Sequence, residues 1–288
     1  MNWIILSFLM FFSSIVYYLL LRYSQILQID RKVNFIANFS IPSILFLLLA
    51  VSRGVSLNPG IGVILASFFV ALFLNFIGSV AAFRGMEQAP NAGYSVIIQK
   101  SYALYTSVAA IFLFNSPLPI YKYIAIVFII FSLGIVSKSK NRSNVKYRGY
   151  FWVALSLVSF FCYGTQSLVA KYLISSGTPS VVYLFWNIFF TTIISLVDYA
   201  WHYRQIIFVP SKKNIFVLMA IGLSVSFFYY FKQVAEVAAP NVGYVNAINA
   251  SSNAILILLV AMIFKESISK LKFIAVLGVI VGIVVLIV

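Results

Sequence analysis

The chain has very few groups of the kind that enzymes use. Its 288 residues include five acidic side chains, one histidine and one cysteine. This set excludes a disulfide within the chain, and the sequence holds no metal-ligand cluster, Walker loop or nucleophile motif. We therefore expect no enzyme activity, no cofactor and no metal. If the protein moves a solute actively, a gradient or exchange must supply the energy, because no ATP-binding sequence is present.

Charged residues are scarce in general, at 9 % of the chain, whereas soluble domains have about 25 %. Apolar residues make up 63 % and form continuous runs. Runs of about 20 residues cross about 30 Å of hydrocarbon at about 1.5 Å per residue. The composition therefore predicts an all-α integral membrane protein and excludes a soluble domain. Continuous runs also exclude the alternating pattern of a β-barrel.

Ten candidate spans can be counted. The first run, Trp3–Leu21, has no basic segment before it and no small-residue cleavage site after it, so it is interpreted as a retained helix. The loops are short, and Cys162 falls inside a span. The expected spans are 3–21, 34–51, 61–83, 91–113, 120–137, 150–171, 181–200, 214–233, 241–264 and 272–288.

One short sequence occurs twice. Ala-Pro-Asn-Ala-Gly-Tyr at residues 89–94 returns as Ala-Pro-Asn-Val-Gly-Tyr at residues 239–244, and the register continues to Lys122/Lys272. The chain is thus predicted to be a duplicated five-span unit. Because five crossings are an odd number, the second copy starts on the opposite side, which makes the repeats inverted. Inverted repeats are typical of alternating-access transporters. The predicted units are a first repeat at 1–138, a basic linker at 139–149 and a second repeat at 150–288.

The net charge of +15 comes from basic residues in the loops between spans, a placement that favours lipid headgroups over nucleic acid as the partner. Most of the 20 Lys and Arg residues follow the odd-numbered spans, and Lys100 lies within a span. The opposite side has only Arg53, Lys122, Lys171 and Lys232. The positive-inside rule therefore places both termini outside the cell.

The repeated motif opens the fourth and ninth spans. Proline suits a first helical turn, asparagine can cap a helix, and glycine permits close packing of two backbones. One interpretation is therefore purely structural, with two helix starts and close packing. In the other interpretation the turn lines the transport pathway, with the helix N-terminus facing an anionic group. The residues concerned are Pro90, Asn91, Gly93, Tyr94, Pro240, Asn241, Gly243 and Tyr244.

Two polar stripes follow the motif. Asn246, Asn249 and Asn253 share one face of the ninth span, where unpaired amides would cost about 2–7 kcal/mol in hydrocarbon. Gln99 occupies the position equivalent to Asn249 and shares a face with Tyr102. We interpret both stripes as substrate-binding walls of a polar cavity. Hydrogen bonding between helices is the alternative.

Lys100 is the most unusual residue, because it stands about 13 Å into the fourth span at 1.5 Å per residue. An intramembrane lysine is a candidate functional site, and no carboxylate lies well inside any expected span. The partner of Lys100 is either an anionic group of the substrate or a carboxylate near a span end; a neutral or hydrated lysine is the remaining alternative. At the polar end of the eighth span, the pair Lys232–Glu236 has ordinary helix spacing. Weaker candidates are Gln166, Trp186 and Asn187 for the pathway, and Gly278 with Gly282 for packing within the chain or in a homodimer.

The chain resembles the EamA-like branch of the drug/metabolite transporter superfamily. The likeness covers its length, the two five-span repeats, the Ala-Pro motif of each fourth span and the acid Glu266 after the ninth span, where the first copy has Ser116. The resemblance implies a multi-pass transporter of the cytoplasmic membrane, often an exporter of amino acids or other small metabolites. It also implies a cavity lined by spans 1, 3, 4, 6, 8 and 9, and cytoplasmic termini, which disagrees with the charge distribution.

Together these features predict a secondary transporter that exports a small polar metabolite by alternating access. Lys100, Gln99, Tyr102 and the three asparagines are the predicted substrate contacts. Efflux of lipophilic cations is one alternative, which a cavity lysine disfavours. A membrane scaffold that transports nothing is another. The predicted partners are the substrate and membrane lipids, and the chain acts as a monomer or a homodimer.

Overall fold

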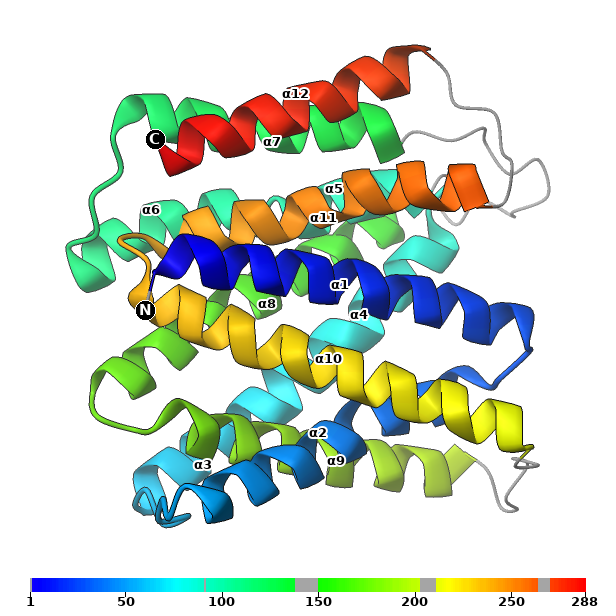
Figure 1. Ribbon diagram of the computed structural model, residues 1–288, viewed down its shortest axis with the longest axis vertical. Coiled ribbons are helices and arrows are strands. Elements are labelled where there is room, and N and C mark those ends of the chain that lie inside the picture. Colours follow the sequence, from blue (N-terminus) through cyan, green and yellow to red (C-terminus); the bar gives the residue numbers. More distant parts are fainter. Residues whose placement is uncertain (1, 91, 138–149, 203–210, 264–269) are drawn as a thin grey trace.

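The computed structural model describes residues 2–90, 92–137, 150–202, 211–263 and 270–288. Every regular element within these ranges is a helix (Figure 1). Asn91, the linker 139–149 and Glu266 lie outside the described residues. The elements are α1 (Trp3–Ile26), α2 (Arg31–Ser52), α3 (Ile61–Phe69), η1 (Val70–Ile77), α4 (Gly78–Gln88), α5 (Ala92–Lys100), α6 (Tyr102–Phe114), α7 (Ile120–Ser137), α8 (Phe151–Ser175), α9 (Ser180–His202), α10 (Lys212–Ala238), α11 (Val242–Ile263) and α12 (Lys270–Ile287).

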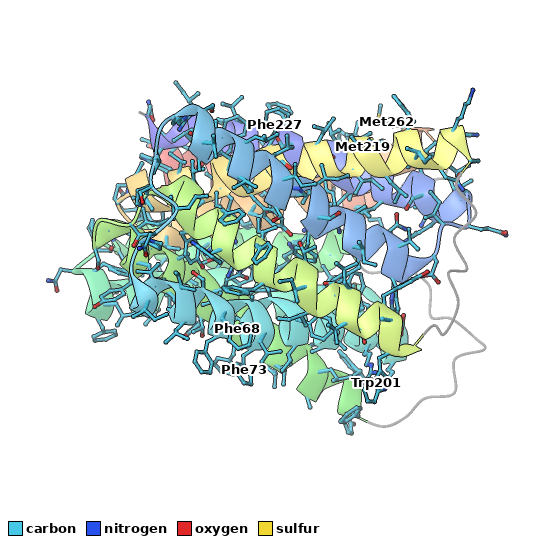
Figure 2. The ribbon with its side chains drawn as sticks, turned by 90° about the horizontal axis from the view of Figure 1, so that it is seen from below. Phe68, Phe73, Trp201, Met219, Phe227 and Met262 are labelled. Carbon is cyan, nitrogen blue, oxygen red and sulfur yellow. The ribbon has the colours of Figure 1, made fainter. Side chains whose placement is uncertain are left out.

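Eight helical segments in the described residues are long and apolar enough to cross a membrane. Each of the ten expected spans coincides with a helix or with a run of consecutive helices, although the crossing of all ten stays a prediction. Large apolar side chains point outward on opposite faces of the bundle, among them Phe227 and Met262 on one face and Phe73 and Trp201 on the other (Figure 2). Water would not solvate such a surface, whereas lipid would. The all-α membrane fold is confirmed.

Two of the expected spans are interrupted. The third contains a π-helical segment, η1, in which Asn75 is buried and its amide nitrogen donates to Asn187 on α9. Single π-helical turns inside α-helices often occur at functional sites. The fourth span breaks at Ser101, directly after Lys100, where the Ser101 hydroxyl donates to the carbonyl of Ile97. Such i−4 bonding by serine bends helices.

The helices pair across the two halves of the chain. In Figure 1, α12 lies along α7, α2 along α9 and α1 along α10, and these pairs share the most extensive contacts together with α4 and α8. Lys122 near the start of α7 donates to the carbonyl of Leu286 near the end of α12. Likewise, Lys32 near the start of α2 reaches Asp198 near the end of α9. Equivalent helices therefore run antiparallel, as inverted repeats require.

The two glycines of α12 pack within the chain. A Cβ on Gly282 would lie 2.5 Å from Cγ1 of Ile129, and one on Gly278 would lie 2.8 Å from the Ser132 hydroxyl, both on α7. Small residues at these positions let the two backbones approach closely. Of the two interpretations of this glycine pair, packing within the chain agrees with the structure.

Candidate functional site

The second copy of the motif forms a helix start that is bound to the first half of the chain. The Asn241 side-chain oxygen accepts from the backbone nitrogen of Gly243 at 2.8 Å, and its amide nitrogen donates to the carbonyl of Ser107 at 3.1 Å. A Cβ on Gly243 would overlap the Ser107 side chain and lie 2.7 Å from its Cα. The Tyr244 hydroxyl donates to the carbonyl of Pro117. These contacts support the structural interpretation of the motif, with α11 held tightly against α6.

The first copy of the motif is in a different environment. Pro90 and Tyr94 are half-buried, and of this copy only Asn91 is outside the described residues. Gly93 lies in the first turn of α5. In the second copy Pro240 is exposed, but every residue from Asn241 to Ser252 is buried. The two copies therefore share a sequence and a place in the fold, but not a degree of enclosure.

The asparagine stripe of α11 faces α6. The amide nitrogen of Asn246 donates to the Thr106 hydroxyl and that of Asn249 to the Tyr102 hydroxyl, each at 3.1 Å. Asn253 is half-buried and donates to the carbonyl of Ala250 on its own helix. The side-chain oxygens of Asn246 and Asn249 are buried without a hydrogen-bond partner. The stripe therefore joins helices through its nitrogens and keeps two acceptors available, so its role in substrate binding stays a prediction.

Gln99 makes hydrogen bonds to α4 and to its own helix, α5. Its amide nitrogen donates to the carbonyl of Ala82 on α4 at 3.1 Å and to the Ser95 hydroxyl at 2.9 Å, and the side chain is buried. Ser95 in turn shares a hydrogen bond with Ser156 of α8. The bonds of Gln99 to Ala82 and of Ser95 to Ser156 join α5 to neighbouring helices, which is the structural alternative to substrate binding. Contact with a substrate stays a prediction for Gln99.

Lys100 ends α5 and turns toward α1. Its ammonium nitrogen lies 6.0 Å from the centre of the Tyr18 ring, within the range of a cation–π contact. The side chain is half-buried, and no carboxylate pairs with it among the residues that the structure describes. Lys100 also lies within electrostatic range of Tyr102 and of Lys232 on α10. A second cation therefore stands near the first, on a helix of the other half.

Two phenols, Tyr18 and Tyr102, lie near these cations, and three more lie near those two. We call the five the tyrosine cluster: Tyr17, Tyr18, Tyr102, Tyr163 and Tyr229. They come from α1, α6, α8 and α10. The rings of Tyr102 and Tyr163 meet edge to face at 6.3 Å, and those of Tyr17 and Tyr18 lie 4.9 Å apart. Tyr17 accepts a hydrogen bond from Asn38, and Tyr163 donates to Ser79 on α4. The cluster therefore joins both halves of the chain, and Tyr18 and Tyr102 place it beside Lys100.

In the pair Lys232–Glu236 the carboxylate is buried and the lysine is half-buried. The Glu236 side chain is 2 % exposed, and Lys232 Nζ lies 3.5 Å from its Oε1. Lys232 also donates to the Ser167 hydroxyl of α8 at 3.3 Å. The expected eighth span ends at residue 233, whereas α10 continues to Ala238, so Glu236 lies in the last turn of the helix. Glu236 thus lies near a helix end, as the sequence predicts, but it is buried there.

Comparison with known proteins gives the family. The model of the EamA-like transporter family matches residues 150–288, the range that the sequence analysis assigns to the second repeat. The chain belongs to this family. It is a membrane transporter of the drug/metabolite transporter superfamily, and the family is one of transporters and not of enzymes. The boundaries of the first repeat and the linker stay predictions.

The solved structures agree on the fold of this EamA-like protein, with 28 matching chains. One of them, described only as "Crystal structure of protein", superposes with a TM-score of 0.80 over 98 % of this chain and 98 % of its own. The two sequences are 13 % identical, so the likeness shows the fold alone. No curated protein matches the chain.

The side chains around Lys100 come from the helices that the family resemblance implies for a central cavity. The first, third, fourth, sixth and eighth expected spans supply Tyr18, Ser79, Tyr102, Tyr163 and Lys232, and the ninth supplies Asn249. Lys100 and Tyr102 are among the residues predicted from the sequence, whereas Tyr17, Tyr18 and Tyr163 are not. The sequence feature that could have indicated them is a polar group inside an apolar run, as in the adjacent Tyr17 and Tyr18 of α1.

Proposed function

We propose that this EamA-like transporter moves a small anionic or zwitterionic metabolite across the cytoplasmic membrane by alternating access. The observation that carries the proposal is the half-buried ammonium of Lys100, which has no carboxylate partner among the described residues. An uncompensated cation inside a membrane bundle is costly. An anionic group of the substrate would offset that cost and so be attracted to this position.

The tyrosine cluster gives such a substrate its other contacts. The hydroxyls of Tyr18 and Tyr229 make no hydrogen bond in the described part of the chain, so both can donate to a carboxylate or accept from an amine. The free side-chain oxygen of Asn249 lies beside Tyr102 and can accept from an amine. One cation, several hydroxyls and an amide oxygen suit an amino acid or a similar metabolite.

Alternating access is supported by the unequal enclosure of equivalent helix ends. Residues 244–250 of α11 are all buried, whereas most of the equivalent residues 94–100 of α5 keep accessible surface. Inverted repeats that differ in this way can exchange conformations, which would enclose the α5 end and open the α11 end. Export is the direction that the family resemblance implies.

Flux measurements on purified protein in proteoliposomes test the proposal. The solutes are L-glutamate, L-alanine, L-lysine, inorganic phosphate and tetraphenylphosphonium, each measured against protein-free vesicles. We expect flux of an anionic or zwitterionic solute and none of tetraphenylphosphonium, because two lysines disfavour a lipophilic cation. Flux of tetraphenylphosphonium alone would support efflux of lipophilic cations, and flux of none of the five would contradict the proposed substrate class.

A further inference from the structure

Glu236 is the one fully buried carboxylate among those described. Asp30 and Glu87 are exposed, and Asp198 is half-buried and paired with Lys32. Glu236 as a whole residue is 1 % exposed. A carboxylate in such a place needs compensating charge or hydrogen bonds to stay ionised. The surroundings of Glu236 therefore determine whether it holds a proton.

The groups that face Glu236 come from three helices. Lys232 on α10 lies 3.5 Å from Glu236 and also donates a hydrogen bond to the Ser167 hydroxyl of α8. Lys171 of α8 is within electrostatic range and donates to the carbonyl of Ala239 at 3.0 Å. Tyr183 of α9 is also within range, and its buried hydroxyl has no hydrogen-bond partner. Two lysines and one tyrosine therefore act on this carboxylate.

Lys232 connects this group to the tyrosine cluster. Its ammonium lies 3.5 Å from Glu236 and is also within electrostatic range of Tyr18, Tyr102 and Lys100. The same ammonium can therefore compensate either Glu236 or an anion bound beside Lys100. At 3.5 Å its contact with Glu236 is longer than a normal hydrogen bond, and Oε1 of Glu236 accepts no hydrogen bond.

We propose that Glu236 is the proton-coupling residue of this transporter, with Lys232 as the switch between Glu236 and the anionic substrate. When the site is empty, Lys232 and Lys171 hold Glu236 ionised. When an anion binds beside Lys100, Lys232 turns to the anion, and Glu236 takes up a proton from water. The proton adds to the carboxylate oxygen, no other bond changes, and the proton and the anion then cross together, outward only where the anion gradient exceeds the opposing proton gradient.

Linkage between the two sites gives the sign of the effect. If the anion favours protonation of Glu236, then protonation favours binding of the anion by the same factor. The apparent affinity for the anion thus rises as pH falls, by up to about tenfold per pH unit for one linked proton. The proposal rests on the proposed function in so far as an anion occupies the site.

Infrared spectroscopy tests the switch without a substrate. The Lys232→Gln variant withdraws the ammonium as a bound anion would. We expect a carboxylic-acid C=O band at pH 7 in this variant, and no such band in the wild type or in the Lys232→Gln/Glu236→Gln double variant. The chain has only five acidic side chains, so the band can be assigned. Absence of the band from Lys232→Gln would overturn the proposal.

Transport driven by a pH gradient is the second test, and it remains decisive if Lys232→Gln does not fold. Proteoliposomes are loaded at a higher pH than the bath, and accumulation of the transported solute of the panel is compared with and without the gradient. We expect a gradient-driven rise in the wild type and in the control Glu87→Gln, whose carboxylate is exposed and bound to Arg31. The rise should be absent in Glu236→Gln.

A gradient-driven rise that persists in Glu236→Gln would overturn the coupling proposal and leave the proposed transport intact. Wild-type flux of no solute in the panel would instead contradict the proposed function, and the infrared band would still decide the protonation of Glu236. A band at the position of a protonated acid in the wild type without substrate would show that the empty site already holds the proton. That result also counts against the switch.

Discussion

The amide nitrogen of Asn249 lies 3.1 Å from the hydroxyl of Tyr102 and donates a hydrogen bond to it. Asn249 belongs to the second half of the chain and Tyr102 to the first. Tyr102 also begins α6, directly after the break at Ser101, and lies two residues from Lys100. This hydrogen bond therefore joins the two repeats beside the proposed anion site, and a relative motion of the repeats would change it.

A double-mutant cycle of Asn249→Ala and Tyr102→Phe should show coupling between these side chains. Hydrogen bonds between helices in membranes contribute about 0.6 kcal/mol on average, up to about 1.7 kcal/mol. We expect a coupling energy in that range, measured as free energy of unfolding in detergent. If the changes in free energy of unfolding caused by the two single substitutions add up to that of the double variant, the hydrogen bond contributes nothing.

Gly243→Ala should destabilise the protein more than most single changes in a helix. The added Cβ overlaps Ser107 and approaches its Cα, so the backbones of α6 and α11 must move apart. Overpacking of this kind costs about 1–3 kcal/mol. Thermal unfolding is the measurement, and Gly62→Ala is the matched control, because a Cβ there meets no atom within 4 Å. Equal midpoints for the two variants would argue against close packing at the motif.

The orientation of the chain can be read from cysteine labelling in a Cys162→Ser background. Asn58 lies after α2 and Lys212 begins α10, at opposite ends of the bundle, and both are exposed. The distribution of Lys and Arg places Asn58 outside the cell. We expect Asn58→Cys to react with a membrane-impermeant maleimide in intact cells, and Lys212→Cys only after permeabilisation. The reverse pattern would favour the cytoplasmic termini that the family resemblance implies.

The sequence predicted most of the fold because the bilayer leaves little choice. An apolar run of about 20 residues must make all its backbone hydrogen bonds internally in lipid, so it becomes a helix. The duplicated motif, with five spans in each copy, predicted that the two halves are inverted repeats. The two breaks were not predicted. Ser101 bends its helix while bonding to Ile97, yet the equivalent Ser251 makes the same bond to Ala247 within a continuous α11. Packing against other helices, which a single sequence does not show, decides the difference.

Prediction of the site was less complete. Lys100 was found because its depth in an apolar run depends only on sequence, and the structure places it beside Tyr18. Tyrosines near span ends are typical of membrane interfaces, so Tyr17 and Tyr18 could not be told from belt residues. The burial of Glu236 was not predicted, because the expected span stopped at residue 233, five residues before α10 ends. Errors of a few residues at helix ends are the usual limit of such predictions.

The central claim is that Lys100 binds an anionic group of the substrate. Its most direct test is flux through proteoliposomes that contain Lys100→Ala, with Lys122→Ala as the control, because Lys122 bonds to the end of α12 and lies apart from the tyrosine cluster. We predict that Lys100→Ala abolishes transport of the anionic or zwitterionic solute while its abundance in the membrane is unchanged, and that Lys122→Ala still transports. Normal transport by Lys100→Ala would contradict the claim.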